Sequence, residues 1–500
     1  MESAEISSAR RRAVVLGVMC LALAVVVGML ASLLVAVPGM AGDLGASEAE
    51  LQWVMNAYGV AFAGLLLTGG ALGDRYGRRG VLLTGLALFG VASATVVAVD
   101  DVTAIIALRV VAGVGAALVM PMTLAVITHA FPPEERGRAV GVWSGISFGS
   151  ALLGVLAAGG LLELFSWRSV FVLNAGLAAV ALLASAVVTP ASRNPDPAPL
   201  DAVGSLLSVA GIGALVFGIV EGPERGWGDP AVLGGLGAGV VGLVTFVRWE
   251  SGRERPLLDP RVFRLRGVSA GSLVITAETL AMFGFFFLLL QHLQQVLGYS
   301  PFRAGLALVP MALSAIAFSP LAPPIAQRYG MRAVVGGGMA TIGLGLGLMG
   351  LLADRASYWP VLGSTALLGA GIAFAATPAT DAIVAALPRG EQGVASALND
   401  LTRELGGVLG IAALGSAFNT VYRAEIADAT SAEAPRDSLA AALATAERLG
   451  GPAGERLAEA ARDAFTAGML GALLVGGAVV VVGGLAAALL LPGRDASDPN

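Results

Sequence analysis

The stretch Gly70-Ala71-Leu72-Gly73-Asp74-Arg75-Tyr76-Gly77-Arg78-Arg79 joins two apolar runs, at about residues 51–73 and 80–99. Each run is long enough to cross a bilayer as a helix. The link itself holds one acid, three arginines and three glycines. It is therefore predicted to form a charged hinge at a membrane surface, and an ordinary positive-inside loop is the alternative interpretation.

The composition supports a membrane protein. Hydrophobic residues make up 56% of the 500 residues and charged residues only 13%, whereas about a quarter of a soluble protein is charged. The pattern predicts an all-α polytopic membrane protein, because a backbone in lipid must satisfy its own hydrogen bonds. Fourteen spans are predicted, at about residues 13–37, 51–73, 80–99, 102–123, 140–161, 170–189, 203–220, 231–248, 268–290, 303–325, 333–352, 360–382, 397–418 and 465–491.

The distribution of charge predicts the orientation. Arg10-Arg11-Arg12 precedes the first apolar run, which has no clean cleavage site and reads as a retained helix. Nineteen of the 30 basic residues fall on the side of the N-terminus, and the short opposite loops carry acids such as Asp43, Glu48 and Asp229. We therefore expect a multi-pass protein of a bacterial inner membrane with both termini in the cytoplasm. The scattered basic residues argue against nucleic-acid binding.

An internal repeat divides the chain. Arg75-Tyr76-Gly77-Arg78-Arg79 recurs as Arg328-Tyr329-Gly330-Met331-Arg332, and Glu135-Arg136-Gly137-Arg138-Ala139 recurs as Glu391-Gln392-Gly393-Val394-Ala395. Such repeats are typical of transporters. We predict a six-helix half at 1–189, a linker with two additional transmembrane helices at 190–267, and a second six-helix half at 268–500. Within the second half, an acidic, alanine-rich segment at about 420–464 is expected outside the cytoplasm as one or two amphipathic helices.

The charged stretch resembles the loop motif between helices 2 and 3 of the major facilitator superfamily. The layout of two six-helix halves around a central pair is similar to the fourteen-helix drug:proton antiporter branch of that superfamily. Local strings resemble the same branch, among them Gln52-Trp53 with Tyr58, Trp167-Arg168, and Leu293–Pro301. The resemblance implies a major facilitator fold with alternating access, and it implies that Gly73, Asp74, Arg75, Gly77, Arg78 and Arg79 form a conformational hinge loop.

Arg109 is a charge inside the fourth predicted helix, where an unpartnered charge costs several kcal/mol. Its surroundings resemble a family motif that is associated with proton transfer, and a structural pair between helices is the alternative. Two positions depart from the family pattern. Met29 stands where helix 1 often has an acid, and Val155 stands where the helix-5 antiporter signature has a proline.

Glu278 interrupts the ninth predicted helix about ten residues from its start, near the bilayer midplane. Burial favours the neutral form of a carboxyl group, so this acid is predicted to bind and release a proton as its access alternates. It could instead pair an organic cation, be a structural acid, or pair with Arg109. Asp400, Arg403 and Glu404 are interpreted as helix-end charges and interfacial salt bridges.

Asn56, Tyr58, Phe283 and Phe286 are candidates for lining a substrate cavity, with lipid contact as the alternative for the phenylalanines. The only cysteine, Cys20, and the two histidines, His129 and His292, are not spaced as metal ligands, so no metal site is predicted. No phosphate loop or catalytic triad is recognised, so we expect no enzyme activity and no cofactor beyond a proton gradient.

The resemblance implies proton-coupled efflux of lipophilic drugs or antibiotics, including cationic ones, across the bacterial inner membrane. The expected partners are a small lipophilic substrate, protons and membrane lipid, and the expected state is a monomer. An uncoupled facilitator or lipid exporter is the first alternative, favoured by Met29 and Val155. A non-transporting membrane sensor or scaffold is an alternative of a different class.

Overall fold

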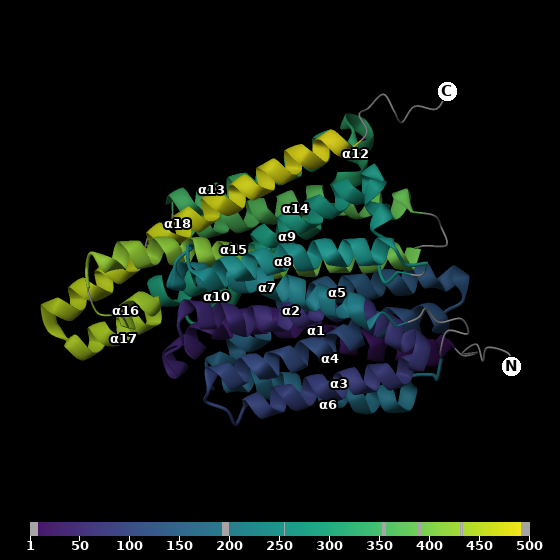
Figure 1. Ribbon diagram of the computed structural model, residues 1–500, viewed down its shortest axis with the longest axis horizontal. Helices are drawn as coiled ribbons and strands as arrows, with labels where there is room; N and C mark the ends of the chain where they lie inside the picture. The colour runs from purple at the N-terminus through teal and green to yellow at the C-terminus, as the bar shows by residue number, and fades with distance from the viewer. Residues whose placement is uncertain are drawn as a thin grey trace. The chain divides into compact units, whose positions relative to one another are not determined.

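The computed structural model describes residues 9–192, 200–254, 256–352, 357–387, 392–430, 432 and 434–491, and every regular element in these ranges is a helix (Figure 1). The first part of the chain forms α1 (Ala9–Leu44), α2 (Glu48–Tyr76), α3 (Arg78–Val96), α4 (Val102–Ala130), α5 (Pro133–Leu162), α6 (Arg168–Val188), α7 (Ala202–Arg225) and α8 (Pro230–Ser251). The rest forms η1 (Pro260–Arg264), α9 (Arg266–Gln291), η2 (His292–Val296), α10 (Pro301–Leu306), α11 (Val309–Phe318), η3 (Ser319–Leu321), α12 (Ala322–Tyr329), α13 (Met331–Leu352), α14 (Trp359–Ala386), α15 (Gln392–Ala427), α16 (Ala434–Asp437), α17 (Leu439–Leu449) and α18 (Gly451–Leu490).

Thirteen helical segments of the described chain are long and apolar enough to cross a membrane. They correspond to thirteen of the fourteen predicted spans. The remaining span, 140–161, falls within α5, of which Gly149–Leu162 is a shorter apolar stretch. Large apolar side chains lie exposed along these helices, Val187 of α6 and Leu489 of α18 among them. Exposed apolar surface on this scale is expected of helices that face lipid.

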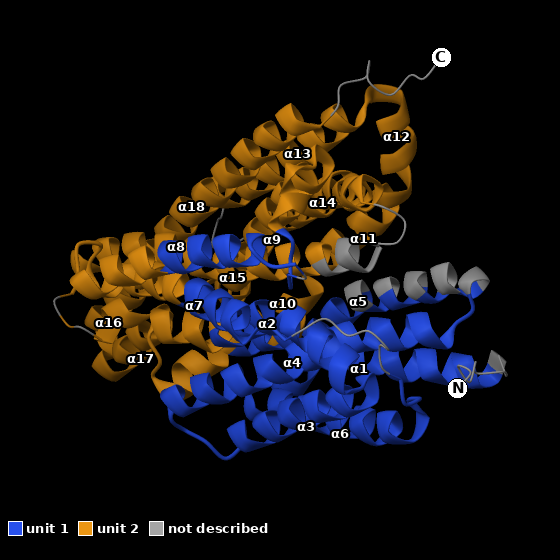
Figure 2. Ribbon diagram, turned by 45° about the vertical axis from the view of Figure 1, so that its right-hand side comes forward, with its two compact units in different colours: residues 1–36, 57–213, 239–259 blue, residues 37–56, 214–238, 260–500 orange. Residues whose placement is uncertain are grey.

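The helices form two compact units (Figure 2). One comprises residues 1–36, 57–213 and 239–259, and the other comprises residues 37–56, 214–238 and 260–500. The division runs through α1, α2, α7 and α8. In the first unit α3 packs against α4 and α6, and in the second α9 packs against α14, α15 and α18. The predicted halves at 1–189 and 268–500, with the segment 190–267 between them, remain a prediction.

The predicted span at 303–325 is not one continuous helix. It is divided into α10, α11, η3 and α12, with prolines at the start of each piece. Proline lacks the N–H that continues a helix and clashes with the preceding turn, which explains the breaks. Together the pieces still form one membrane-crossing segment, Pro301–Tyr329.

The segment 420–464 is more ordered than a loop. α15 continues to Ala427 and α18 begins at Gly451. Between them, α16 packs against α15 and α17, and α17 packs against α18. The apolar face of α17, with Leu439, Ala442 and Ala446, is buried, and a Cβ on Gly454 of α18 would lie 2.2 Å from the carbonyl oxygen of Ala446. The apolar face of this amphipathic helix therefore packs against α18.

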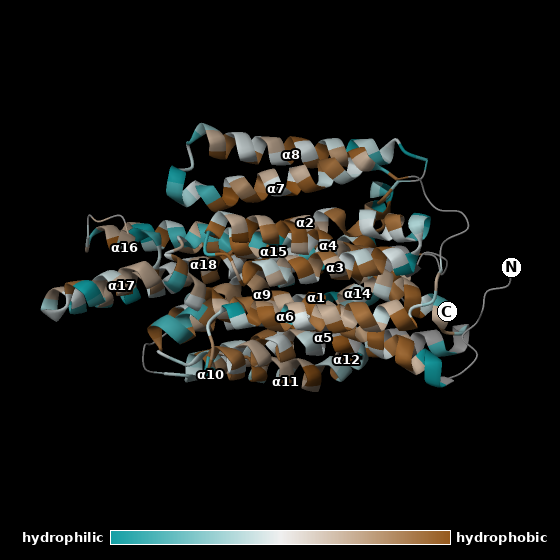
Figure 3. Cartoon of the chain, turned by 90° about the horizontal axis from the view of Figure 1, so that it is seen from below, coloured by the Kyte–Doolittle hydropathy of each residue, from teal (hydrophilic) through white to brown (hydrophobic). Residues whose placement is uncertain are grey.

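α7 and α8 form a hairpin whose hydrophilic residues gather at its ends (Figure 3). At one end Trp249 donates a hydrogen bond of 2.7 Å to Asp201, and Arg253 forms a 3.2 Å ion pair with the same carboxylate. Burial would raise the pKa of Asp201, but hydrogen bonds from Gly204 and Trp249 and the charge of Arg253 hold it below its usual value. The ion pair thus fastens the two helix ends together. Most of the linker before α7, residues 193–199, lies outside the described residues.

Candidate functional site

The charged hinge loop is a turn of one residue between α2 and α3. Gly77 has a φ of +105°, a conformation that favours glycine, and its N–H donates to the carbonyl of Gly73 at 3.0 Å. Asp74 accepts two hydrogen bonds from Arg78, at 3.0 and 3.3 Å, and Arg78 also donates to the carbonyl of Ala125 in α4. Arg75, in contrast, is exposed. Of the arginines in the predicted hinge loop, Asp74 therefore binds Arg78, and Arg78 fastens the turn to α4.

The second copy of this loop has the same backbone. Gly330 joins α12 to α13 with a φ of +87°, as Gly77 joins α2 to α3. The arginines two residues after each turn glycine behave alike: Arg79 donates to the carbonyl of Ala186 in α6, and Arg332 donates to the carbonyl of Ala488 in α18. This shared geometry supports the predicted duplication. The other repeated string, at 391–395, lies outside the residues whose side chains are described.

Arg109 is completely buried in α4. Its guanidinium carbon lies 4.4 Å from the ring centroid of Tyr58 in α2, a cation–π distance, and its Nη1 lies 3.5 Å from Sδ of Met29 in α1. The Tyr58 hydroxyl in turn donates to the carbonyl of Val26 at 3.2 Å. Arg109 therefore meets the residue that replaces the expected helix-1 acid. The other departure, Val155, is buried beside Gly154, whose Cβ would lie 2.5 Å from the carbonyl oxygen of Gly28.

Glu278 lies in the middle of α9 with only 2% of its surface exposed. Its Oε2 is buried and has no hydrogen-bond partner among the described residues. Next to it, Thr276 donates to the carbonyl of Thr402 in α15 at 3.3 Å. The cation that acts electrostatically on Glu278 is Arg403 of α15. The predicted proton acid and this cation therefore lie on neighbouring helices of the same unit.

Arg403 also acts on Asp400 and Glu404. The sequence predicts helix-end groups for these three charges, and Arg403 links them electrostatically to Glu278 as well. The single guanidinium of Arg403 can neutralise only one of the three carboxylates. Binding of a proton to another carboxylate therefore lowers the excess negative charge of the group. We call Glu278, Asp400, Arg403 and Glu404 the α9–α15 charge cluster.

Two glycines bring α15 against α9 beside this cluster. A Cβ on Gly410 would lie 2.1 Å from the carbonyl oxygen of Leu280, and one on Gly406 would lie 2.0 Å from Oγ1 of Thr279. Glycines four residues apart let membrane helices approach closely. The sequence Gly406-Gly407-Val408-Leu409-Gly410 thus sets the close packing of α15, which carries Arg403, against α9, which carries Glu278.

The predicted cavity residues are divided between the two units. Tyr58 belongs to the unit that holds Arg109, whereas Asn56, Phe283 and Phe286 belong to the other. Asn56 is buried, and both atoms of its side-chain amide have no hydrogen-bond partner in the described chain. Phe283 is half-buried against Gly407, and Phe286 pairs with Phe285. A cavity that contains all four residues remains a prediction.

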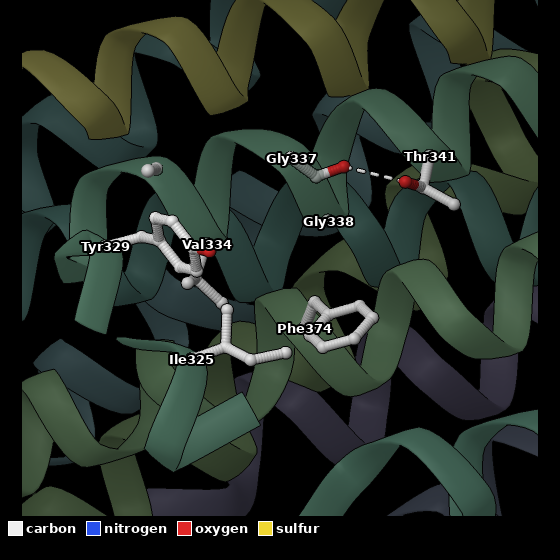
Figure 4. A pocket seen from close by; sticks show the side chains of 8 residues that line it. Ile325, Tyr329, Val334, Gly337, Gly338, Thr341 and Phe374 are labelled. Atoms are coloured by element: carbon white, nitrogen blue, oxygen red, sulfur yellow. Dashed lines mark hydrogen bonds between the residues drawn. The ribbon is translucent and has the colours of Figure 1, made fainter. Parts of the chain in front are cut away.

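An open groove of about 360 Å³ lies between α12, α13 and α14 (Figure 4). Ile325, Val334 and Phe374 line it with apolar surface, and the hydroxyl of Thr341 donates to the carbonyl of Gly337 at 2.8 Å. The groove contains no predicted site residue. In the ranges that the structure describes, no group of three or more His, Cys, Asp or Glu side chains could hold a metal ion.

Sequence reasoning missed the burial of Glu48. Glu48 was assigned to an exposed loop, but it is the first residue of α2 and is only 1% exposed. The signal was present. Ser47 and Glu50 have capping-box spacing, and Glu48, Gln52 and Asn56 recur every four residues on one helix face.

The sequence matches the Major Facilitator Superfamily over residues 19–411 and 271–499, in two overlapping segments. The chain belongs to this superfamily. Its members are transporters, and the many apolar helices make this one a multi-pass membrane protein.

Several characterised superfamily proteins are similar over nearly the whole chain. The tetracenomycin C resistance and export protein of Streptomyces glaucescens is 34% identical, covering 94% of this chain and 89% of its own. The multidrug efflux pump LfrA of Mycolicibacterium smegmatis is 30% identical, covering 94% and 95%. The methyl viologen resistance protein SmvA of Salmonella typhimurium is 33% identical, covering 86% and 88%.

Solved transporter structures share the fold at low identity. A bacterial homologue of the human lysosomal transporter Spinster, in an inward-facing, unoccupied conformation, has a TM-score of 0.68 at 16% identity and covers 98% of this chain and all of its own. An auto-inhibited peptide transporter of the POT family has a TM-score of 0.65 at 15% identity, covering 98% and 99%. These structures establish the major facilitator fold.

Proposed function

We propose that this chain exports lipophilic drugs or antibiotics, including cationic ones, out of a bacterial cell in exchange for protons. The similar proteins named for resistance, export or efflux support the substrate class. The inner membrane with both termini in the cytoplasm, and the monomeric state, are part of this proposal.

The α9–α15 charge cluster is the observation that carries the proton coupling. A buried carboxylate in a membrane helix costs free energy, so such acids are usually paired with a cation or belong to an ion or proton pathway. Glu278 is buried with one oxygen unpartnered by the described residues, and Arg403 acts on it from the neighbouring helix. Proton transport requires an acid that can be both protonated and deprotonated during the cycle. Glu278 is our candidate, and Asp400 and Glu404 share its counter-charge.

Arg109 has a separate role in this proposal. It lies fully buried against Tyr58 and Met29, with a methionine where the family often has a helix-1 acid. We assign Arg109 to the stability of α1, α2 and α4 and to the proton path of its own unit. Asp74, Arg78 and Gly77 serve as the hinge that holds α2, α3 and α4 in one arrangement.

The direct test is transport into inverted membrane vesicles from a strain that lacks its own efflux pumps. The probes are methyl viologen, tetraphenylphosphonium and a neutral lipophilic antibiotic. We expect an imposed pH gradient, acidic inside, to drive accumulation of at least one probe when the chain is present and not when it is absent. Movement that only follows the probe gradient would favour the uncoupled facilitator, which Met29 supports. Absence of any movement would favour the sensor or scaffold.

A further inference from the structure

A row of buried polar side chains occupies the first turns of α2. Glu48, Gln52 and Asn56 are spaced four residues apart, so they share one face of the helix. Their exposed fractions are 1%, 0% and 1%. The row runs about 12 Å along the helix axis, from 1.5 Å per residue. We call these three residues the α2 polar row.

The start of α2 is fixed by a reciprocal cap. The backbone N–H of Glu50 donates to the Ser47 hydroxyl at 3.2 Å, and the N–H of Ser47 donates to the Glu50 carboxylate at 2.9 Å. This capping box sets the helix register and leaves Glu48 facing inward. There Nε2 of Gln291, at the end of α9, donates to the Glu48 carboxylate at 3.3 Å.

α15 faces the α2 polar row. A Cβ on Gly415 would lie 2.7 Å from the amide carbon of Gln52, so the two helices touch at this point. Ser416 and Asn419 follow on α15 and are 2% and 0% exposed. Among the described residues, nothing hydrogen-bonds the side-chain amides of Gln52, Asn56 and Asn419 or the hydroxyl of Ser416. Buried polar atoms normally have partners, and water supplies them where protein does not.

The charged and titratable groups around Glu48 come from four other elements. Glu224 of α7 acts on Glu48 directly, and Glu48 acts on Tyr422 of α15. Arg423 of α15 forms a 3.4 Å ion pair with Asp437 of α16, and both act on Glu224. His292 of η2 is buried and stacked on Phe465. In the described part of the chain, no arginine forms an ion pair with Glu48.

We infer that Glu48 and the α2 polar row form a second proton-binding site, in which Glu48 accepts a proton from water held by Gln52, Asn56 and Asn419. In the step, a hydronium ion gives its proton to a carboxylate oxygen of Glu48, a new O–H bond forms, and water remains. The inference rests on the proposed proton coupling. In the proposed orientation this site lies at the extracytoplasmic ends of α2 and α9, where protons would enter.

The site is distinct from the α9–α15 charge cluster. Glu48 is hydrogen-bonded to Gln291, which lies thirteen residues after Glu278 in the same helix. At 1.5 Å per residue the separation along α9 is about 20 Å. A hydrocarbon core is about 30 Å thick, so one proton could not serve both acids without a relay. The α2 polar row supplies hydrogen-bonding groups over about 12 Å of α2.

The test is pH-difference infrared spectroscopy of the purified full chain in lipid nanodiscs, which detects protonated carboxyl groups without transport. We expect a titrating carboxyl band that is lost in Glu48→Gln and kept in Glu278→Gln. Asp43→Asn is the matched control, because Asp43 is an exposed acid of the preceding segment, and it should keep the band. A spectrum in which Glu48→Gln loses no carboxyl band would overturn the inference, whether or not the protein transports.

Water access has its own measurement. After transfer to D₂O, the Glu48 band of the wild type should shift rapidly, and Asn56→Leu, which removes one polar member of the row, should slow this shift several-fold. An unchanged exchange rate would show that the α2 polar row does not supply water to Glu48. If Glu48→Gln instead abolishes tetraphenylphosphonium binding while every carboxyl band persists, Glu48 holds a substrate cation and the inference is wrong. If Glu48→Gln fails to fold, Glu48→Asp replaces it, with an altered band position as the expected result and an unaltered spectrum as the contrary one.

Discussion

Nη1 of Arg109 lies 3.5 Å from Sδ of Met29, so a fully buried guanidinium meets a thioether where an acid is often found in the superfamily. Tyr58 contributes a cation–π contact from the other side. Neither group carries a formal negative charge. The arrangement predicts that the position of Met29 can accept a carboxylate.

Met29→Asp should therefore stabilise the protein by about 1–3 kcal/mol, because a charge-assisted hydrogen bond replaces a weak sulfur contact. The measurement is the thermal unfolding midpoint of the purified chain in detergent. Met29→Asn is the matched control, with the same shape and no charge, and it should not stabilise. If Met29→Asp is no more stable than Met29→Asn, the desolvation of the new carboxylate outweighs its pairing with Arg109.

The close packing of α9 on α15 leaves no room for a side chain at Gly410. In Gly410→Ala the new Cβ would lie 2.1 Å from the carbonyl oxygen of Leu280, and backbone cannot move aside cheaply. We expect a loss of about 1–3 kcal/mol in stability and reduced transport, since α15 carries Arg403 away from Glu278. Gly336→Ala in α13, where nothing lies within 4 Å of the new Cβ, should be tolerated. Equal unfolding midpoints for the two variants would contradict the close approach.

Most of the fold could be predicted from the sequence, because lipid demands long apolar helices and because Gly77 and Gly330 mark equivalent turns in the two copies. The broken helix at 303–325 was readable from its prolines. The site was harder. Glu278 stood out as a charge in an apolar run, but its relation to Arg403 depends on how α9 packs on α15. Glu48 was misassigned because its hydrogen-bond partner, Gln291, is distant in sequence.

For the hinge, Asp74→Asn should cut transport severely and leave membrane expression intact. The ion pair with Arg78 is half-exposed and spaced i, i+4, so it contributes well under about 1 kcal/mol to stability. A loss of transport would thus reflect the conformational cycle. Arg75→Gln, which changes an exposed charge of the same loop, is the control and should transport normally. Normal efflux by Asp74→Asn would mean that the loop only fixes topology.

The orientation can be tested by labelling with an impermeant maleimide in whole cells. In a Cys20→Ser background, Gly228→Cys in the exposed turn between α7 and α8 should react from outside, and Arg75→Cys should react only after the membrane is opened. Gly228 is chosen because it is open and does not cap α8, as Asp229 does through its bond to Ala231. The reverse pattern would place both termini outside.

Glu278→Gln is the central test of the proposed coupling. The amide mimics a permanently protonated carboxyl group, so substrate can still bind and exchange downhill, but a pH gradient can no longer drive accumulation. We expect accumulation in inverted vesicles to fall to the level set by the probe gradient alone. Downhill exchange in proteoliposomes is measured in parallel and should persist, which separates lost coupling from lost folding.

Glu278→Asp keeps a titratable group on a shorter arm beside Arg403, so it should retain part of the coupling. Glu404→Gln removes another carboxylate on which Arg403 acts. It should weaken the pH dependence of transport less than Glu278→Gln does, because Glu278 is the one acid of the α9–α15 charge cluster that α9 contributes. If Glu278→Gln accumulates a probe as the wild type does, with the same pH dependence, Glu278 is structural. Coupling would then have to reside in Asp400, Glu404 or the unit of Arg109, or the chain would be an uncoupled facilitator.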